Sequence, residues 1–573
     1  MASSVLIVGA GPAGLSLALL LLRNGISVKI IDKAPKHFIG TRGAGVMPRT
    51  LELYKIAGIL PQIEGVGNLT LPKLRIYTSP EGDAPINEFH MLEHCDPEPS
   101  YHRITAMSVH QDEHQAALRE IIENEYGVSV ELATELVSFE QSPEHVTVQL
   151  AKLAHGTTEA HQFDWVVGTD GARSVVRKQL ELSFDGSDST DIWYAIGDIE
   201  MQKTHEEDVS STLRPFDHLA NGHISTGGSG AMSLTESKHA LQLLISLTKL
   251  TVSDSLGLRP YERNGKKYCW FICGGANVDV HAIEGNRDRL VGLMYDIIGK
   301  REISFGDLVA FGTWRSNVRM ANKFNVDRVF LGGDAAHVHS FTGAQGVNTS
   351  VQDSFNLAWK LSLVQKGLAP RSLLDSYSAE RVPVVAGMLG KTTAYMHQTF
   401  SNVENKGEGW KRDWTIRQFG INYRGSPIIL DERYTDTTEP IDPYRSGDDK
   451  SAHAGDRAPE APGLQLADGR VTSIFNFLDY VSHTVLIFGE GELTKVVEKL
   501  PLPSGVVKSI LVLPAGSPFS SDNAVVDAEG FAHKHYKVKE GEKLVVVIRP
   551  DGYIGAVSKS KSGVVDYFKR ILL

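Results

Sequence analysis

A short stretch at the N-terminus limits the fold more than any other feature of the chain. Residues 5–8 (VLIV) predict a buried strand, and the glycine-rich turn of residues 9–14 (GAGPAG) follows directly, ahead of a helical run to residue 23. Asn24-Gly25 ends that helix, and residues 28–32 predict the next strand, which closes on Asp32. The pattern is a complete βαβ unit, and it predicts a parallel sheet with helices on its faces.

The spacing inside this unit predicts a dinucleotide site. The glycines allow a tight turn, close approach of a pyrophosphate and close packing of the helix on the strand. The helix N-terminus offers unpaired N–H groups and a positive dipole end to that pyrophosphate, and Asp32 would accept hydrogen bonds from an adenosine ribose. The motif alone does not separate FAD from NAD. The residues expected at the cofactor are Gly9, Gly11, Pro12, Ala13, Gly14, Asp32 and Lys33.

Two later segments repeat the pattern of a strand that runs into a turn. Residues 164–174 predict a strand ending in Asp170-Gly171, and residues 328–337 predict one ending in Gly333-Asp334. The glycine-bearing stretch 343–348 comes next and leads into a helix to about residue 366, where apolar residues recur at helical spacing. A single acid of this kind is often only a turn or cap residue. Three such elements in order favour a ligand site.

With these elements in place, the chain resembles the single-component FAD-dependent aromatic hydroxylases of the p-hydroxybenzoate and phenol hydroxylase type. The matching features are the N-terminal glycine motif, Asp170-Gly171, Gly333-Asp334, the stretch 346–361, and Arg49-Thr50-Leu51-Glu52 with Arg42 upstream. They extend over roughly residues 1 to 395. The resemblance implies bound FAD, NADPH or NADH as co-substrate, a small aromatic substrate and dioxygen, in chemistry that passes through a flavin hydroperoxide.

The resemblance also implies roles for individual residues. Asp334 would bind the ribityl chain of FAD, and Asp170 would bridge the FAD site and the region where NAD(P)H docks. Gln111 would lie near the diphosphate and ribityl region, and Arg42 would reach the cofactor. Backbone N–H groups of the stretch 343–348 would approach the flavin pyrimidine ring and stabilise the negative charge of the reduced flavin. The residues of that stretch expected at the cofactor are Gly346, Val347 and Asn348.

The expected fold class is α/β: a Rossmann-like FAD-binding domain, an inserted substrate-binding β-sheet domain and a C-terminal thioredoxin-like domain. The FAD-binding domain would occupy residues 1–183 and 313–401, on either side of the sheet domain at 184–312. A connector at 402–450 would lead to the last domain at 451–573, where residues 485–488, 509–513 and 544–548 predict strands and residues 493–500 a helix. Residues 240–245 predict a strand of the inserted sheet. That last segment contains no cysteine, so it cannot exchange disulfides, and a structural or dimerisation role is expected, with a homodimer as one outcome.

Several residues are candidates for the substrate pocket. His223 and Trp314 fall in or beside the inserted sheet, and Phe341 stands where many family members carry a proline beside the flavin. A surface loop would explain His223 equally well, and a core position would explain Trp314. Phenol hydroxylase has an aspartate as the base for its substrate, and Ala44 occupies the matching position here. No catalytic base is therefore assigned.

Composition excludes several other classes of protein. The net charge of -11 is spread along the chain without a basic stripe, which argues against nucleic-acid binding. The three cysteines fit a reducing compartment and predict a cytoplasmic protein; Cys269 and Cys273 have the wrong spacing for a redox pair and are expected to be inert core thiols. His337 and His339 lack supporting ligands, so no metal is expected. No run of 18 apolar residues predicts a membrane span, and residues 564–573 are expected to form a docked helix.

The leading hypothesis is an NAD(P)H-consuming monooxygenase that hydroxylates a phenolic or polyketide-like molecule of secondary metabolism. Baeyer–Villiger oxidation, epoxidation and oxidative decarboxylation use the same flavin oxygen and stay open. A flavin reductase or dehydrogenase that never inserts oxygen is the alternative enzyme class, and a redox-sensing flavin module is the non-enzyme alternative. NAD(P)H consumption with and without oxygen separates these hypotheses.

Overall fold

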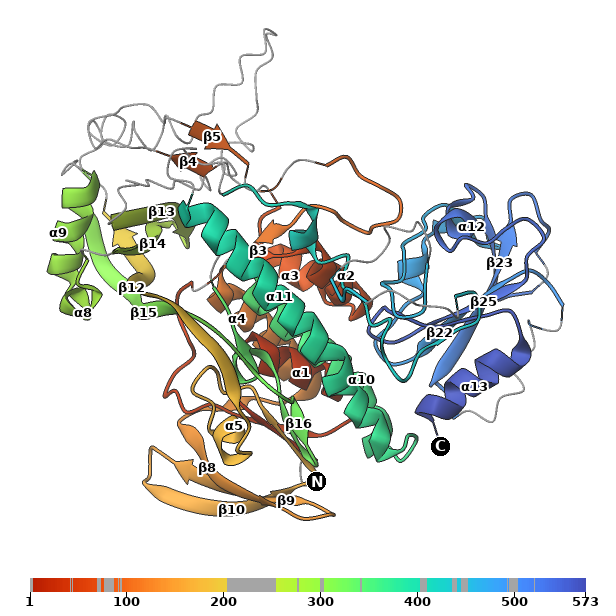
Figure 1. Cartoon of the computed structure of the whole chain (residues 1–573), viewed down its shortest axis with the longest axis horizontal. Coiled ribbons are helices and arrows are strands. Elements are labelled where there is room, and N and C mark those ends of the chain that lie inside the picture. Colours follow the sequence, from red (N-terminus) through yellow and green to blue (C-terminus); the bar gives the residue numbers. More distant parts are fainter. Residues whose placement is uncertain are drawn as a thin grey trace, which may run out of the picture.

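The computed structural model describes most of the chain, in one elongated molecule (Figure 1). The described residues are 4–41, 43, 45–69, 74–76, 87–90, 92, 95–202, 254–275, 278–298, 303–340, 343–401, 410–434, 441–444, 452–491, 493, 503–519 and 521–572. Three predicted site residues, Arg42, His223 and Phe341, lie outside these ranges, as does Ala44. The predicted strand at 240–245 and the predicted helix at 493–500, apart from residue 493, also lie outside these ranges.

A six-stranded sheet forms the centre of the N-terminal part, in the order β16-β17-β11-β1-β2-β7. Every pair is parallel except β16–β17. The strands β1, β2, β11 and β17 are mostly apolar and almost continuously buried, as expected for parallel strands that are covered on both faces. Their bounds are β1 (Val5–Val8), β2 (Val28–Ile31), β7 (Val130–Glu131), β11 (Trp165–Gly168), β16 (Asn325–Val326) and β17 (Val329–Leu331).

Helices cover this sheet. Helix α1 packs along α10 and α4, and nine residues of α1 are buried. The long helices α10 and α11 run diagonally across the middle of the molecule (Figure 1). A three-stranded antiparallel sheet, β8 (Thr134–Gln141), β9 (Val146–Lys152) and β10 (Thr157–Phe163), extends from the lower end. The helices are α1 (Pro12–Arg23), α2 (Pro48–Ile56), α3 (Leu60–Val66), α4 (Gln111–Tyr126), α5 (Val175–Gln179), α10 (Gln345–Gln365) and α11 (Asp375–Ser401).

The inserted segment forms an antiparallel five-stranded sheet in the order β13-β14-β12-β15-β18. One face packs under α8 and α9 in a separate apolar core that contains Cys269 and Cys273. Burial raises the pKa of both thiols to about 12, so both are protonated at neutral pH, as inert core thiols would be. The predicted division after residue 312 falls within β15. The elements are β12 (Phe184–Met201), β13 (Asp254–Arg263), β14 (Lys266–Gly275), α8 (Val280–Ile283), α9 (Arg287–Ile298), β15 (Phe305–Ala321) and β18 (His337–Val338).

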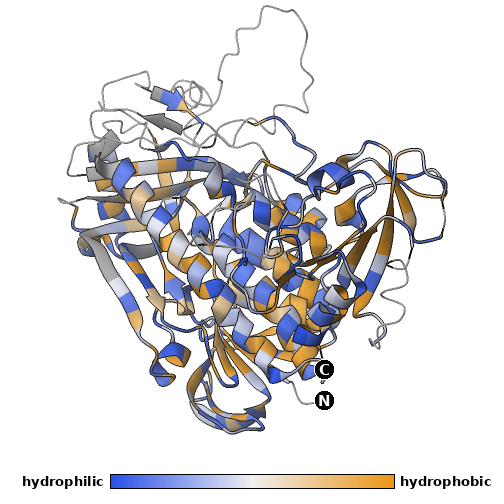
Figure 2. Cartoon of the chain, turned by 45° about the vertical axis from the view of Figure 1, so that its right-hand side comes forward, coloured by the Kyte–Doolittle hydropathy of each residue, from blue (hydrophilic) through white to orange (hydrophobic). Residues whose placement is uncertain are grey.

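The C-terminal segment is built on an eight-stranded mixed sheet, in the order β19-β26-β25-β22-β23-β24-β20-β21. Its apolar strands are prominent in Figure 2. The strands predicted at 485–488, 509–513 and 544–548 are present as β22, β23 and β25, and the predicted terminal helix is α13, capped by Ser560. The bounds are β19 (Leu430–Asp431), β20 (Leu464–Gln465), β21 (Val471–Thr472), β22 (His483–Phe488), β23 (Val507–Pro514), β24 (Ala524–Asp527), α12 (Phe531–His535), β25 (Leu544–Ile548), β26 (Ile554–Ser558) and α13 (Lys561–Ile571).

The short two-stranded sheets lie between these parts. They pair β3 with β6 and β4 with β5, and their bounds are β3 (Gly45–Val46), β4 (Leu74–Ile76), β5 (Asn87–Phe89) and β6 (Met107–Ser108). Four 3₁₀ turns complete the described elements: η2 (Gly333–Ala335), η3 (Arg371–Leu374), η6 (Trp414–Arg417) and η7 (Ile474–Asn476).

Buried charges join the C-terminal segment to the N-terminal part. On α2, Glu52 accepts hydrogen bonds from Arg49 at 3.0 Å and from Arg457 at 3.1 Å, and Arg49 also donates to the carbonyl of Asp551 at 3.1 Å. Both α2 side chains are completely buried. The predicted connector takes part as well, because β19 pairs with β26 in the C-terminal sheet. The stretch around Arg49, which carries part of the family resemblance, thus holds the two parts together.

Candidate cofactor and substrate site

The three predicted cofactor motifs meet at one edge of the central sheet. Gly9 follows β1, Asp170 follows β11 and Gly333 follows β17, and these three strands are parallel neighbours. Backbone hydrogen bonds link their ends: Thr169 N donates to the Val8 carbonyl at 2.8 Å, and the Gly332 N–H donates to the Gly168 carbonyl at 3.0 Å. The carboxyl edge of a parallel sheet is where ligands bind in such folds.

The glycines of the first motif have different tasks. A Cβ on Gly9 would lie 2.4 Å from the Thr169 carbonyl oxygen, and one on Gly14 would lie 2.1 Å from the Gly9 carbonyl oxygen. These two glycines are therefore required by the packing of the protein itself. A Cβ on Gly11 would meet no atom within 4 Å. Helix α1 begins there with Pro12 and has no side-chain cap, so its N–H groups and positive dipole end are available to a ligand.

Asp32 secures the same turn from the end of β2. Its Oδ2 accepts a hydrogen bond from Ala10 N at 2.9 Å, and its Oδ1 accepts one from Ala34 N at 2.9 Å. A carboxylate has about four lone-pair positions, so capacity for a ribose hydroxyl is left. The neighbouring Lys33 is exposed.

Asp170 is partly used by the protein. Its Oδ2 accepts hydrogen bonds from Val175 N at 2.7 Å and Val176 N at 3.3 Å, which caps the start of α5. Its Oδ1 is buried and has no hydrogen-bond partner among the described residues. Burial raises the pKa of this carboxyl group above its usual value, although those backbone hydrogen bonds lower it. The cap explanation and the ligand explanation therefore apply to different oxygens of one side chain.

The third motif lies directly against the first. Gly333 has a φ of +60°, and a Cβ there would lie 3.1 Å from the Cβ of Ala13 on α1. The Ser354 hydroxyl on α10 donates to the Ala13 carbonyl at 2.8 Å. Asp334 is exposed although the residues on both sides of it are buried, so its carboxylate is accessible in the turn that follows β17.

A buried ion pair that the sequence motifs did not reveal holds this turn. Asp353 on α10 accepts hydrogen bonds from Gly333 N at 3.0 Å and from Arg381 Nε at 2.7 Å, and its Oδ2 lies 2.8 Å from His337 Nε2. Burial alone would raise the pKa of Asp353, but Arg381 and His337 hold it below its usual value. Asp353 could have been found from the sequence, because it lies in the family-like stretch and within the predicted helix. No sequence motif pointed to Arg381, which lies 28 positions further along the chain.

At the N-terminus of α10, the Asn348 side chain bonds to the protein, whereas backbone N–H groups are left for a ligand. Asn348 Oδ1 accepts from Met47 N at 2.7 Å, while Nδ2 donates to the carbonyls of Gly45 at 2.9 Å and Ala344 at 2.7 Å. This side chain therefore fixes β3 against α10. Gly346 has a packing role too, because a Cβ there would lie 2.6 Å from His339 Nε2. The helix has no side-chain cap, which leaves the first backbone N–H groups, including that of Val347, for a ligand.

Gln111 and Trp314 lie on the two sides of the boundary with the inserted sheet. Gln111 is the first residue of α4 and is half-buried. Trp314 on β15 is opposite Tyr194 on β12, with ring centroids 5.9 Å apart. Strand alternation places this pair on the same sheet face as Trp270, whose indole N–H donates to the Thr41 carbonyl of the nucleotide-binding part at 2.8 Å. Trp314 thus belongs to the sheet face that contacts the N-terminal part at Thr41.

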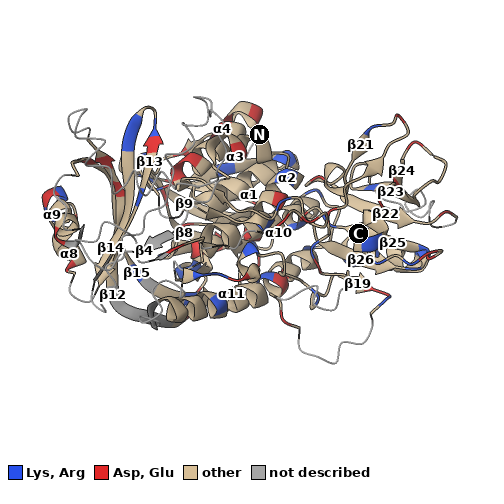
Figure 3. Ribbon diagram, turned by 90° about the horizontal axis from the view of Figure 1, so that it is seen from above, with Lys and Arg blue, Asp and Glu red and all other residues tan. Residues whose placement is uncertain are grey.

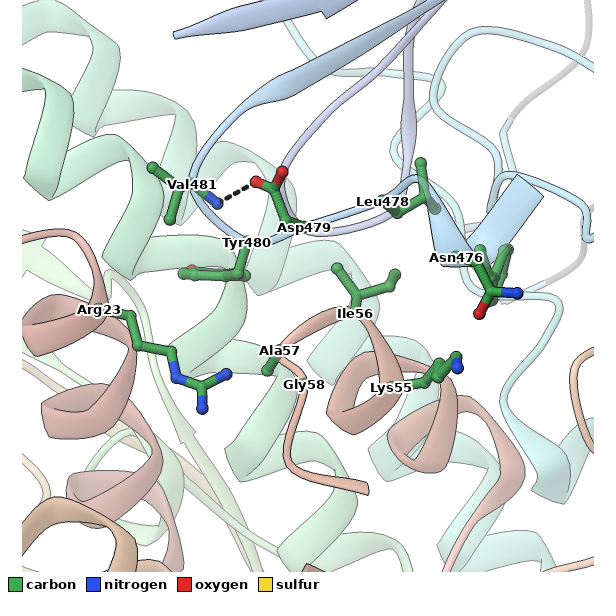
Figure 4. A pocket seen from close by; sticks show the side chains of 11 residues that line it. Arg23, Lys55, Ile56, Ala57, Gly58, Asn476, Leu478, Asp479, Tyr480 and Val481 are labelled. Atoms are coloured by element: carbon green, nitrogen blue, oxygen red, sulfur yellow. Dashed lines mark hydrogen bonds between the residues drawn. The ribbon is translucent and has the colours of Figure 1, made fainter. Parts of the chain in front are cut away.

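A surface cavity of about 300 Å³ lies elsewhere, between the C-terminal ends of α1 and α2 and residues 475–481 (Figure 4). Since the cofactor motifs are at the N-terminal end of α1, this cavity is not part of the same site. In the part of the chain that the structure describes, no cluster of three or more His, Cys, Asp or Glu could hold a metal ion. None of the described helices is both long and apolar enough to cross a membrane. Acidic and basic residues are interspersed along the ribbon in Figure 3.

Two protein families match this chain, one over each of its two main parts. Residues 2–392 match the family described as FAD binding domain, and this range covers well over half of the chain. The chain belongs to this family. Residues 450–573 of the flavoprotein match a second family, the phenol hydroxylase C-terminal dimerisation domain.

Two relatives that match nearly the full length of the flavoprotein are named as monooxygenases. A flavin-dependent monooxygenase of Mycobacteroides abscessus is 32% identical over 99% of this chain and 100% of its own. Pentachlorophenol 4-monooxygenase of Sphingobium chlorophenolicum is 28% identical over 97% of this chain and 93% of its own. The protein is therefore an FAD-dependent monooxygenase of the phenol hydroxylase branch, as its sequence motifs predicted.

Solved structures share the fold. The flavin-dependent monooxygenase PieE, in complex with FAD and substrate, has a TM-score of 0.77 at 20% identity and covers 99% of this chain and 98% of its own. Aklavinone-11 hydroxylase, with FAD and aklavinone, has a TM-score of 0.75 at 22% identity and covers the same shares. The predicted α/β fold class is confirmed; the thioredoxin-like character of the last segment stays a prediction.

The residues of the monooxygenase fit FAD. The open space at Gly11 is large enough for close approach of a phosphate, and the uncapped N-termini of α1 and α10 both lie at the carboxyl edge. The buried, unpartnered Oδ1 of Asp170 and the accessible Asp334 add two acceptors for hydroxyl donors there. This donor and acceptor set suits a dinucleotide with a pyrophosphate and a polyol chain.

Proposed function

We propose that this monooxygenase inserts one oxygen atom of dioxygen into a small aromatic molecule, phenolic or polyketide-like, with NADPH or NADH as the reductant. The balance is substrate–H, O₂, NAD(P)H and a proton giving substrate–OH, water and NAD(P)⁺. The observation that supports it best is the convergence of three cofactor motifs at one sheet edge. Beside it, the aromatic sheet face of Tyr194, Trp270 and Trp314 contacts the nucleotide-binding part at Thr41. The relative named for pentachlorophenol supports a phenolic substrate, and those named for 6-methylpretetramide and polyketide hydroxylation support a substrate of secondary metabolism.

The residues at the carboxyl edge have separate parts in this proposal. The α1 N-terminus beside Gly11 holds the pyrophosphate, Asp32 the adenosine ribose and Asp334 the ribityl chain. Backbone N–H groups at the start of α10, around Gly346 and Val347, stabilise negative charge on the pyrimidine ring. Gln111 is near the diphosphate and ribityl region, and Asp170 Oδ1 bridges the FAD site and the region where the nicotinamide would approach.

FAD, when bound, supplies a two-electron centre that accepts hydride from the nicotinamide and reacts with dioxygen. The task of the protein is then to orient the substrate and exclude water. Aromatic side chains such as Tyr194 and Trp314 offer ring faces against which an aromatic substrate can pack. A phenol reacts best as phenolate, so a positive field should favour its ionisation. No described residue is assigned as the base.

The C-terminal segment supports a further proposal, that the enzyme is a homodimer joined through residues 450–573. The matching family is named for dimerisation. The segment also exposes apolar side chains, with Val471 64%, Phe519 41% and Val481 40% exposed. Light scattering on the purified enzyme gives the mass directly, and a monomer at micromolar concentration would contradict this proposal.

A panel of phenols and polyketides, scored by product mass under labelled dioxygen, tests the reaction class. The correct substrate should accelerate NAD(P)H oxidation and yield a product with one labelled oxygen atom. A bound but wrong substrate should give hydrogen peroxide without product, because water then reaches the site. Label from water, or turnover at full rate without oxygen, would reject the monooxygenase reaction in favour of a dehydrogenase. Ring-expanded, epoxidised or decarboxylated products would replace hydroxylation by the corresponding flavin chemistry.

A further inference from the structure

Thr41 is held by the inserted sheet and by α4 at the same time. Its backbone N–H donates to Asp198 Oδ2 on β12 at 2.8 Å, and its carbonyl accepts from the Trp270 indole on β14 at 2.8 Å. Its hydroxyl lies 2.5 Å from Nδ1 of His110, the N-cap residue of α4. Every polar group of this residue is therefore engaged, two of them by the sheet.

The preceding residue is held in the same way. The Gly40 N–H donates to Asp112 Oδ2 at 2.8 Å, and Arg263 on β13 holds both oxygens of Asp112, at 2.9 and 2.8 Å. Gly40 has a φ of +111°, and a Cβ there would lie 2.5 Å from the Cβ of Ala310 on β15. The backbone of residues 40–41 is therefore in direct contact with the sheet, with no space for a side chain between them.

Asp198 is the centre of this contact. It is completely buried, and its second oxygen accepts a hydrogen bond from the Tyr261 hydroxyl at 3.0 Å. Burial raises the pKa of Asp198 to about 6, although Thr41 and Tyr261 hydrogen bonds lower it. A buried carboxyl group costs free energy unless its hydrogen bonds compensate. A neutral side chain of similar size would avoid that cost. We therefore expect Asp198 to have a role beyond packing.

The other side of Thr41 leads to a predicted cofactor residue. The His110 ring lies against Tyr261 in a tilted arrangement, with ring centroids 4.1 Å apart, and burial lowers the pKa of His110 to about 3, which keeps it neutral. Gln111 follows His110 directly and opens α4. A continuous set of contacts thus runs from the sheet through Asp198, Thr41 and His110 to the position of Gln111.

We propose that Asp198 is a positioning residue that couples the substrate-facing sheet to the start of α4, so that substrate on the sheet sets the geometry for flavin reduction. The inference rests on the proposed function, since it assumes that substrate occupies this sheet face. The step it controls is hydride transfer: NAD(P)H gives a hydride, with both electrons, to bound FAD and leaves as NAD(P)⁺. Asp198 itself touches neither reactant and acts through Thr41.

Two variants of the FAD-loaded enzyme separate coupling from charge. Asp198→Ala removes both hydrogen bonds, whereas Asp198→Asn retains an acceptor for Thr41 N and a donor toward the Tyr261 oxygen. Asp185→Asn on the same strand is the control, because Asp185 is exposed. The first readout is hydrogen exchange without substrate. Asp198→Ala should raise exchange at residues 40–41 and in peptides covering residues 110–118, by about tenfold, the factor for loss of one hydrogen bond to a charged group. Asp198→Asn and the control should not.

The second readout is the rate of flavin reduction by NADPH or NADH under anaerobic conditions, with and without phenol or pentachlorophenol. The ratio of the two rates should fall by about tenfold in Asp198→Ala and be largely restored in Asp198→Asn. FAD content per folded chain should stay unchanged. An Asp198→Ala enzyme with the wild-type ratio per bound flavin would overturn the proposal, because it would show that Asp198 only stabilises the fold.

The two readouts fail differently. If neither probe stimulates reduction of the wild-type flavin and no compound of the panel is oxygenated, the proposed function fails, whatever the exchange data show. If exchange rises only at residues 40–41 and not at the start of α4, the coupling is absent and the inference fails, whether or not phenols are oxygenated.

Discussion

Arg549 near the C-terminus donates hydrogen bonds to both carboxylate oxygens of Glu380 on α11, from Nη1 to Oε1 at 2.7 Å and from Nη2 to Oε2 at 2.9 Å. Both side chains are completely buried. Lys360 on α10 adds a third contact to Glu380 at 2.8 Å. Burial alone would raise the pKa of Glu380, but Arg549 and Lys360 hold it well below its usual value. Glu380 thus links the last segment to α11 and, through Lys360, to α10, whose N-terminus lies at the cofactor motifs.

Breaking this link should destabilise the whole enzyme. Arg549→Met leaves Glu380 buried with one cation fewer, and loss of one partner of a buried pair costs about 3–5 kcal/mol of the free energy of unfolding. Urea denaturation followed by circular dichroism measures the change. Arg470→Met is the matched control, since its pair with Asp468 is 77% exposed on the arginine side and its loss should leave the free energy of unfolding essentially unchanged. Equal midpoints for the two variants would contradict this account.

Truncation should be more harmful than the sequence suggested. From the motifs alone, a chain ending near residue 449 would retain FAD binding, because all three motifs precede it. The structure changes this expectation: such a chain leaves Glu380 without Arg549 and Glu52 without Arg457, and exposes the apolar surface that the tail covers. We expect aggregation and no yellow protein on size exclusion. A folded fragment that binds FAD as tightly as the full chain would show that these contacts are dispensable.

Two neighbouring glycines should respond differently to the same substitution. Gly11→Ala meets no protein atom and keeps a φ of -73°, so the stability of the apoprotein should be unchanged or slightly higher. FAD affinity should fall, because the new methyl group enters the space assigned to the pyrophosphate. Gly9→Ala, with a φ of +104° and a clash with the Thr169 carbonyl, should fail to fold. Thermal melts and FAD titration check both, and wild-type FAD affinity in Gly11→Ala would reject the assignment.

His483 should make the enzyme sensitive to acid. It is buried among Trp359, Tyr567 and Phe568, and burial lowers its pKa to about 3. The unfolded chain takes up this proton near pH 6.5, so the contribution of neutral His483 is present above that pH and is lost as the pH falls toward 3. His483→Phe should therefore gain about 2 kcal/mol relative to wild type between pH 8 and pH 5.

The control for this prediction is His155→Phe, at an exposed turn, which should show no such pH-dependent gain. Comparing each variant with wild type at both pH values cancels any constant packing effect of the larger ring. A His483→Phe difference that does not change between pH 8 and pH 5 would mean that the imidazole is solvated or protonated in the folded chain.

The sequence by itself determined the features that depend on short-range geometry. The βαβ unit, the turns at Asp170 and Gly333 and the strands of the C-terminal sheet were all predictable, since tight turns need glycine and parallel strands need continuous apolar runs. The meeting of the three motifs followed as well, because carboxyl ends of neighbouring parallel strands share one edge of a sheet.

The tertiary structure alone decided which distant charges meet. Nothing in the local pattern pairs Asp353 with Arg381, Glu380 with Arg549, or Thr41 with Asp198, since 157 residues separate the last two. It also decided that the Asn348 side chain is hydrogen-bonded to the protein backbone, and that Gly11, unlike Gly9, faces open space. Turn and strand preferences act between neighbours in sequence, whereas a buried charge is compensated by whichever partner folding brings within hydrogen-bond distance.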